Sequence, residues 1–182
     1  MRKLFFLTSL TSILFGSNLS AIYKLYEKQE YEKGCDYGAK YYSKNLNSEK
    51  YMAFYGLSCL ETNSINRLAQ PMVKLGGTKE LRETASYFAT ILLQKQLLKQ
   101  SLLDGKELGN LNLPKTDFVL SKIFNLFVKK KYSIKDDIYT LVDSEKKDIR
   151  YEVYIKKSKK NINYMIIDIY HGDKFTKRYQ YD

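Results

Sequence analysis

The residue types that most often carry catalysis or bind metals are scarce in this chain. Its 182 residues include one histidine, two cysteines and no tryptophan. Zinc sites need clustered Cys and His ligands, and a Ser-His-Asp or Cys-His mechanism would have to use His171, which lies in a predicted turn beside Gly172 and Asp173. No G-x-S-x-G segment supplies a nucleophile. We therefore expect neither a metal site nor a nucleophilic catalytic centre.

Other kinds of catalytic site are also missing from the sequence. Gly76-Gly77 lacks the flanking Gly and Lys of a nucleotide-binding loop. The neighbouring carboxylates of Asp136 and Asp137 would point to opposite faces of a strand, so they would not form an acid and base pair. The sequence predicts a protein that is not an enzyme, with no catalytic residues and no cofactor.

A long apolar run is absent beyond the N-terminus. Arg2 and Lys3 precede a short apolar stretch, and Leu19-Ser20-Ala21 is typical of a cleavage site. This predicts a signal peptide over residues 1–21 and a mature protein that begins near Ile22. A membrane helix needs about 20 apolar residues, which no window in the chain approaches. We therefore expect an exported, periplasmic protein without an integral membrane segment in the mature chain.

The chain has fewer acidic than basic residues: it contains 20 Asp and Glu and 31 Lys and Arg, which gives a net charge of +11. A basic surface favours acidic partners. An exported protein meets anionic lipids, cell-wall polymers and acidic protein faces rather than nucleic acid. Lysines also keep a protein soluble without binding anything. Only 9 glycines and 2 prolines are present, so long disordered linkers are not expected.

The two cysteines, Cys35 and Cys59, are predicted to form a disulfide. Export would place them in an oxidising compartment, where cysteine pairs tend to bridge. Asn47 lies midway between them, in a polar stretch that separates two helical patterns. Residues equidistant from the turn of an antiparallel helical hairpin lie at the same height, within the short reach of a disulfide.

From Ile22 to Asp104 the apolar residues recur at intervals of three and four, which indicates helices. Tyr23 to Tyr42 can form one helix or two short ones, and a second helical pattern follows the polar stretch. Pro71 makes the next segment short or kinked. Lys79 to Asp104 predicts a long helix that is apolar on two faces. This pattern defines a helical domain over residues 22–105.

The segments Tyr31–Ala39 and Ala53–Leu60 carry a resemblance to tetratricopeptide-type and Sel1-type repeats. The chain resembles exported helical-repeat proteins of Gram-negative bacteria in this respect. That resemblance implies antiparallel helical hairpins and a protein-binding scaffold. Tyrosines at helical spacing either fill the core or contact a partner. Those selected as partner-contacting candidates are Tyr37, Tyr41, Tyr55 and Tyr87.

The C-terminal part of the chain is predicted to be rich in β-structure. Residues 106–115 contain turn-forming residues and little periodicity, so they are expected to connect two domains. Residues 116–182 would form a small α+β domain, in which a helix over Phe118–Val128 packs on a four-stranded antiparallel meander. The four predicted strands are Ile138–Val142, Ile149–Ile155, Ile162–Ile169 and Phe175–Tyr181. This order of elements is similar to small cystatin-like or nuclear-transport-factor-like modules.

Two functions remain open at this point. The first is a non-enzymatic periplasmic scaffold or adaptor, which resembles in general type the accessory structural parts of the flagellar motor. Its partners would be other envelope or periplasmic proteins, and self-association stays open. The second is a basic module that binds an anionic envelope component, a cell-wall polymer or a lipid head group. The residues selected for this alternative are Lys156, Lys157, Lys159 and Lys160.

Overall fold

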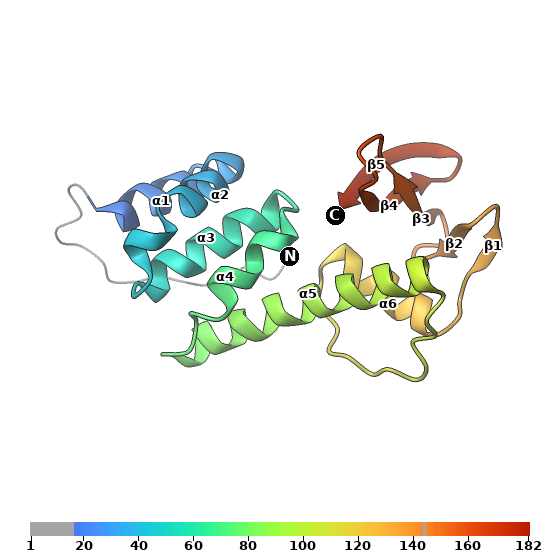
Figure 1. Cartoon of the computed structure of the whole chain (residues 1–182), viewed down its shortest axis with the longest axis horizontal. Helices are drawn as coiled ribbons and strands as arrows, with labels where there is room; N and C mark the ends of the chain where they lie inside the picture. Colours follow the sequence, from blue (N-terminus) through green and yellow to red (C-terminus); the bar gives the residue numbers. More distant parts are fainter. Residues whose placement is uncertain (1–16, 144) are drawn as a thin grey trace. The chain divides into compact units, whose positions relative to one another are not determined.

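A computed structural model of the chain describes residues 17–143 and 145–182. In this part of the chain six α-helices precede a five-stranded antiparallel sheet, so the protein has the predicted α+β class (Figure 1). The chain divides into two compact units, the first ending at Ala89 and the second beginning at Thr90. This division falls inside helix α5 (Lys79–Asp104), upstream of the predicted connection over residues 106–115.

The first unit is helical, and its helices begin where the sequence offers caps. Ser48 accepts a hydrogen bond from the Tyr51 N–H at the start of α3, and Thr78 accepts one from the Leu81 N–H at the start of α5. The predicted first helix is a pair of short helices, and the Pro71 segment is a short helical turn. The bounds are α1 (Asn18–Glu27), α2 (Tyr31–Lys40), η1 (Tyr42–Asn45), α3 (Glu49–Glu61), η2 (Ile65–Leu68) and α4 (Ala69–Met72).

Helices α2 and α3 are joined by the Cys35–Cys59 disulfide, which confirms the predicted pairing. Two glycines allow this close approach. A Cβ on Gly38 would collide with the Tyr55 ring, and one on Gly34 would lie 2.7 Å from the Ser58 Oγ. The core of the first unit therefore depends on small residues in α2 that face α3.

The predicted signal peptide falls largely on residues 1–16, which lie outside the described residues. The predicted cleavage after Ala21 lies within α1, because that helix begins at Asn18 with Ser17 as its N-cap. Ser20 and Ile22 are both buried. Cleavage at this position would remove the first turn of a folded helix.

The second unit contains the end of α5, helix α6 (Val119–Val128) and the sheet, whose strands run in the order β1-β2-β3-β4-β5. The number of strands differs from the prediction: there are five and not four. The additional strand is β1, and its three residues are all exposed. The strand bounds are β1 (Ser133–Lys135), β2 (Ile138–Val142), β3 (Ile149–Lys157), β4 (Asn163–His171) and β5 (Lys174–Tyr181).

Strand β1 was not predicted because the turn that joins it to β2 contains no glycine. Lys135 pairs with Ile138, so Asp136 and Asp137 form a two-residue hairpin turn and not part of a strand. Their φ angles are 50° and 60°, as a type I′ turn requires. Aspartate tolerates this left-handed conformation. A glycine is the usual sequence signal for such a turn, and this turn has none.

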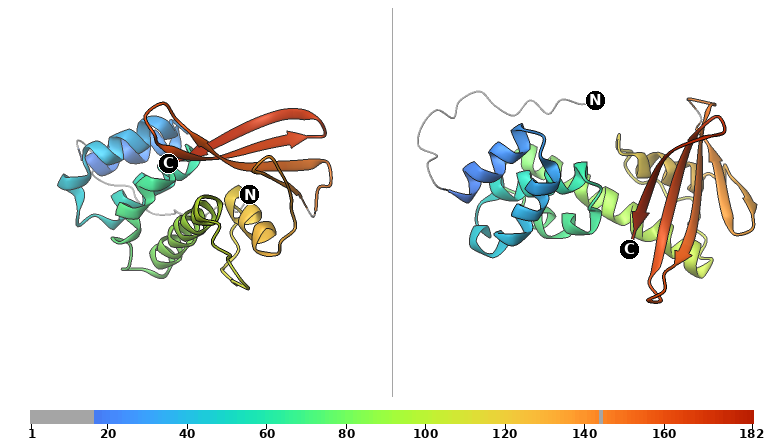
Figure 2. Two further views of the ribbon diagram at one scale, coloured as in Figure 1. Left: turned by 45° about the vertical axis from the view of Figure 1, so that its right-hand side comes forward. Right: turned by 90° about the horizontal axis from the view of Figure 1, so that it is seen from above.

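Helix α6 lies against one face of the sheet (Figure 2). By the register of the strands, Leu141 lies opposite Tyr151, and Val153 opposite Ile167, on one and the same face. These side chains are buried, as are Ile123 and Phe124 of α6. Burying this apolar surface stabilises the unit. The other face carries polar and aromatic side chains together with the buried Ile166, which pairs with Tyr154 in the strand register.

Candidate binding surfaces

Tyr37 and Tyr41, on α2 and at its C-cap, form an aromatic pair on the surface of the first unit. Their ring centroids are 4.5 Å apart, and both side chains are half-buried. The ammonium groups of Lys40 and Lys44 lie 5.3 Å and 6.0 Å from the centre of the Tyr41 ring, at distances typical of cation–π contacts. We call Tyr37, Lys40, Tyr41 and Lys44 the Tyr37–Tyr41 patch.

The Tyr37 side of this patch is held in place by hydrogen bonds. The Tyr37 hydroxyl donates to the Asn18 Oδ1 at 3.0 Å, which connects α2 to α1. The Tyr37 carbonyl accepts a hydrogen bond from the hydroxyl of buried Tyr51 at 3.0 Å. Burial raises the pKa of the Tyr51 hydroxyl, so it remains a donor at neutral pH. These hydrogen bonds fix the Tyr37 side of the patch to α1 and α3.

The other two candidate tyrosines lie elsewhere. Tyr55 is only 1 % exposed and packs against Gly38, so it is a core residue with no surface for a partner to contact. Tyr87 is half-buried on α5, with its ring edge-on to Phe88 at 6.5 Å. The structure therefore brings Tyr37 and Tyr41 together and assigns Tyr55 to the core.

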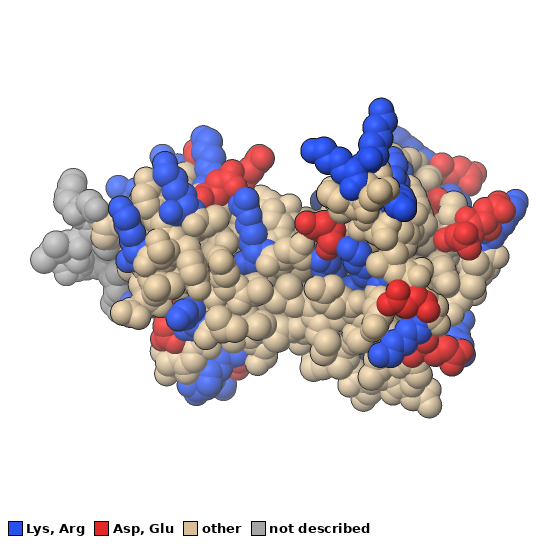
Figure 3. Space-filling view, in the orientation of Figure 1, with Lys and Arg blue, Asp and Glu red and all other residues tan. Residues whose placement is uncertain are grey.

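The four candidate lysines lie at one end of the β3–β4 hairpin. Lys156 and Lys157 end β3, and Lys159 and Lys160 occupy the tight turn that follows. The Ser158 hydroxyl stabilises this turn by accepting from the Lys160 and Ile162 N–H groups. All four lysines are exposed, and among the described residues none of them forms an ion pair. Figure 3 shows Lys and Arg side chains projecting from the surface of the protein.

The outer face of the sheet carries a hydrogen-bonded polar network. Asp168 is 2 % exposed, and its carboxylate accepts hydrogen bonds from Arg178 and from the Tyr154 hydroxyl. Beside it, the guanidinium of Arg150 lies 4.4 Å from the centre of the Tyr170 ring. Asp168, Arg178 and the Tyr154 hydroxyl bond to one another and so stabilise the sheet, whereas the Arg150 Nε is buried without a hydrogen-bond partner among the described residues.

His171 and the carboxylates weighed for catalysis are not brought together. His171 is exposed and pairs with Asp148 at 2.8 Å, at one end of β4. Asp136 and Asp137 are exposed turn residues. In the described part of the chain, no group of three His, Cys, Asp or Glu side chains is placed to hold a metal ion.

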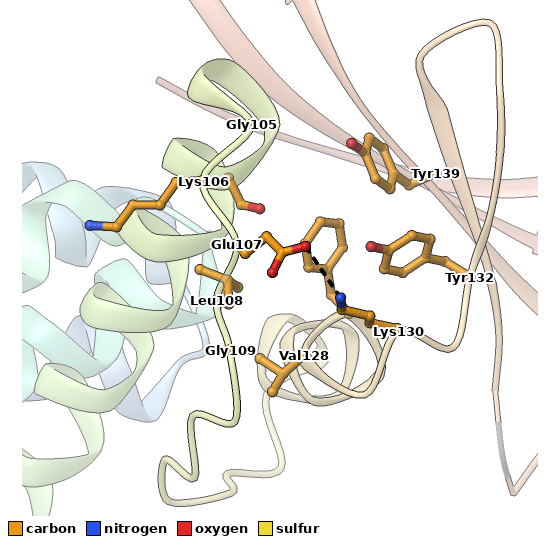
Figure 4. A pocket seen from close by; sticks show the side chains of 11 residues that line it. Gly105, Lys106, Glu107, Leu108, Gly109, Val128, Lys130, Tyr132 and Tyr139 are labelled. Carbon is orange, nitrogen blue, oxygen red and sulfur yellow. Dashed lines mark hydrogen bonds and ion pairs between the residues drawn. The ribbon is translucent and has the colours of Figure 1, made fainter.

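The structure also contains a pocket that no pattern in the sequence indicates. It lies in the second unit, between the loop after α5, the end of α6 and the β1–β2 hairpin, and its volume is about 170 Å³ (Figure 4). Its residues come from separate segments between Ser101 and Tyr139, which no local motif reveals. The pocket is lined by apolar and aromatic side chains and by one charged pair, among them Leu108, Phe127, Val128, Tyr132, Tyr139, Glu107 and Lys130.

Three aromatic rings in contact form one side of this pocket. The Phe127 ring lies 4.9 Å from Tyr132 and 5.1 Å from Tyr139, and the two tyrosines are 5.2 Å apart. Both tyrosine side chains extend from the hairpin toward the loop that carries Glu107 (Figure 4). Within the described residues, neither tyrosine hydroxyl has a hydrogen-bond partner. The Lys130 ammonium lies 3.3 Å from the Glu107 carboxylate across the loop.

Comparison with protein-family models, with curated proteins and with solved structures finds no match to this chain. Among residues 17–143 and 145–182, no helix combines the length and the apolar character needed to cross a membrane.

Proposed function

We propose that this protein is a non-enzymatic scaffold or adaptor of the cell envelope, and that it binds a partner protein through the Tyr37–Tyr41 patch. The observation that carries the proposal is the half-buried pair of tyrosine rings, 4.5 Å apart, on helices held by a disulfide. Tyrosine is enriched at the centres of protein interfaces, since its ring is apolar and its hydroxyl tolerates water. A rigid aromatic surface loses little conformational entropy when it binds.

Two features support a location in the envelope. A disulfide is typical of oxidising compartments such as the periplasm. The N-terminal sequence and the resemblance of the helical segments to exported repeat proteins agree with this location. The general likeness to accessory parts of the flagellar motor makes that machine the first complex in which to look for the partner.

The test is cross-linking from the patch in intact cells. A photoreactive phenylalanine analogue replaces Tyr41, and an affinity tag recovers whatever is cross-linked for mass spectrometry. We expect one or a few envelope proteins among the covalent adducts. The matched control places the same analogue at Tyr23, another half-buried tyrosine of the first unit.

The outcomes separate clearly. Capture from position 41 but not from position 23, abolished by a Tyr37→Ala change, supports the scaffold. If position 41 yields no protein adduct, or the same adducts as position 23, the patch is not an interface and the proposal is wrong.

The β3–β4 hairpin favours a second candidate function, the binding of an anionic envelope component. Four exposed lysines without ion-pair partners in the described chain concentrate positive charge at one hairpin end. Sedimentation with vesicles of anionic lipid, and with purified cell wall, measures this binding. We expect it to weaken steeply with salt and to be lost when Lys156, Lys157, Lys159 and Lys160 are changed to Glu.

A matched control tests whether binding depends only on the net charge of the protein. Changing four scattered exposed lysines to Glu alters the total charge equally while leaving the hairpin intact; they are Lys28, Lys50, Lys79 and Lys115. If both variants lose binding to the same extent, the hairpin is not a specific site. Full binding by the hairpin variant also excludes this function.

A further inference from the structure

We propose that the pocket of the second unit binds a single neutral sugar ring. Its volume of about 170 Å³ is near that of cavities known to hold one six-membered ring, roughly 150 Å³, and is below the range of sites for larger ligands. The occupant is therefore one ring and not a nucleotide or a folded peptide segment.

The lining suits a molecule that has both an apolar face and a polar edge. Leu108, Phe127 and Val128 provide apolar surface, while the Tyr132 and Tyr139 hydroxyls are free within the described chain to donate and accept hydrogen bonds. A pyranose ring has C–H groups on its faces and hydroxyls around its edge. Its C–H face would lie on the apolar side chains, and its hydroxyls would bond to the two tyrosines.

The charged groups at the pocket favour a neutral ligand. Lys130 repels a cation and Glu107 repels an anion. An ion of either sign would therefore be attracted by one of these groups and repelled by the other. The pair is 3.3 Å apart and its side chains are 65 % and 79 % exposed, so it contributes little to stability and opens readily. A sugar hydroxyl can accept from the Lys130 ammonium while another donates to the Glu107 carboxylate.

The geometry of the rings argues against the main alternative, a site for quaternary ammonium. Such a site needs aromatic faces arranged around the cation. Here the three rings touch one another at centroid distances of 4.9 to 5.2 Å, so no cation fits between them. A purely apolar occupant, such as a partner's phenylalanine, would bury the tyrosine hydroxyls without satisfying them.

The test uses the full chain with labelled Leu and Val methyl groups and follows the NMR signals of Leu108 and Val128. Glucose, galactose, mannose and N-acetylglucosamine are each added to about 50 mM, a range that detects binding as weak as millimolar affinity. We expect at least one of the four to move both signals in a saturable way. Choline and phenol are added over the same range of concentrations. They represent the two alternative ligands, a quaternary ammonium ion and an apolar ring.

The hydroxyls are tested by Tyr132→Phe and Tyr139→Phe, which keep the rings and the packing. Each is expected to weaken sugar binding about three- to tenfold, the effect of one lost hydrogen bond. Tyr164→Phe is the matched control, because Tyr164 lies on β4 and does not line the pocket, and it should leave the affinity unchanged.

The proposal is overturned if none of the four sugars moves the Leu108 and Val128 signals, or if choline or phenol moves them instead. It is also overturned if both tyrosine variants bind sugar as tightly as the unmodified chain. Because the pocket and the Tyr37–Tyr41 patch lie in different units, the scaffold function can hold or fail independently of this result.

Discussion

Arg178 and Asp168 form a two-point hydrogen bond across strands β5 and β4. The Nε atom of Arg178 donates to Oδ1 of Asp168 at 2.6 Å, and the Nη2 atom donates to Oδ2 at 2.7 Å. The two residues are direct partners in the strand register, and the Asp168 side chain is 3 % exposed. This hydrogen bonding raises the pKa of the Arg178 guanidinium. A buried carboxylate needs such a partner, since it is costly to leave unpaired.

The first prediction concerns this pair. Arg178→Met leaves the Asp168 carboxylate buried with only the Tyr154 hydroxyl as donor, and it should lower the free energy of unfolding by about 3 kcal/mol. Arg178→Lys should cost about 1 kcal/mol, because an ammonium cannot make the planar two-point contact. Urea denaturation measures both. Lys177→Met, at the neighbouring exposed position, is the control and should change the free energy by about 0.5 kcal/mol or less. Equal effects at 177 and 178 would contradict the prediction.

A second prediction concerns acid stability and Asp143. Burial raises the pKa of this carboxyl, but hydrogen bonds from the Glu145 N–H, the Lys122 ammonium, the Tyr151 hydroxyl and the Lys146 N–H outweigh burial and lower the pKa to about 2. A lowered carboxyl pKa stabilises the folded state fully above the unfolded value near 4. That stabilisation, about 2 kcal/mol by linkage, is lost as the pH falls toward 2.

Asp143→Asn tests this effect. The difference in unfolding free energy between the unmodified chain and the variant should be constant from pH 7 to about 5 and should shrink between about pH 4 and 2. The control is Asp104→Asn, at an exposed position, which should show no such dependence. A difference that stays constant down to pH 2 would show that the Asp143 charge is not what stabilises the unit.

The disulfide should stabilise the first unit. It joins residues 24 positions apart, and closing a loop of this length contributes about 3 kcal/mol in the chain-entropy model. The double change of Cys35 and Cys59 to Ser should lower the unfolding free energy of the first unit by about that amount, measured in urea. Thiol titration of the unreduced, unfolded protein should detect no free thiol; finding two would refute the bridge.

Close helix packing at Gly56 gives a further prediction. A Cβ at this position would collide with the Phe88 ring and would lie 3.1 Å from the Pro71 Cγ. Gly56→Ala should therefore destabilise the first unit by about 2 kcal/mol, because a well-packed core does not accept extra volume. Gly76→Ala is the control: the nearest atom to its Cβ is 4.0 Å away, and its thermal midpoint should match that of the unmodified chain. If Gly56→Ala is equally harmless, the helices are less tightly packed than the structure indicates.

The start of α1 leads to a prediction about processing. Ser17 caps this helix by accepting from the Ser20 N–H at 3.3 Å, and Asn18 accepts from the Tyr37 hydroxyl. A chain that begins at Ile22 loses both interactions and should be less stable than one that begins at Ser17 by about 1 kcal/mol or more. N-terminal sequencing of the protein purified from cells identifies the residue at which the chain begins. Equal stability of the two chains would show that residues 17–21 are dispensable.

Much of the secondary structure could be predicted from local sequence. Helix α5 runs from Lys79 to Asp104 as predicted, since Thr78 caps its start and Gly105, with φ of 65°, ends it. The longer strands were recognised by alternating side chains, and the cysteine pairing followed from equal distances to a turn. The helix ends and the strands depend on residues close in the chain, and the cysteine pairing depends on the position of one turn, so the sequence alone is enough to predict them.

Long-range contacts decided the rest. The three residues of β1 are all exposed and too few to establish an alternating pattern, and only pairing with β2 makes them a strand. Tyr41 and Tyr55 both lie in helical patterns of the sequence. Tyr55 is nevertheless buried, because Gly38 leaves room for its ring, whereas Tyr41 is only half-buried. The pocket joins residues from the end of α5 to β2, and such a site exists only once the chain has folded. Local propensity determined the elements of this protein, whereas packing between distant segments determined which side chains a ligand or partner can reach.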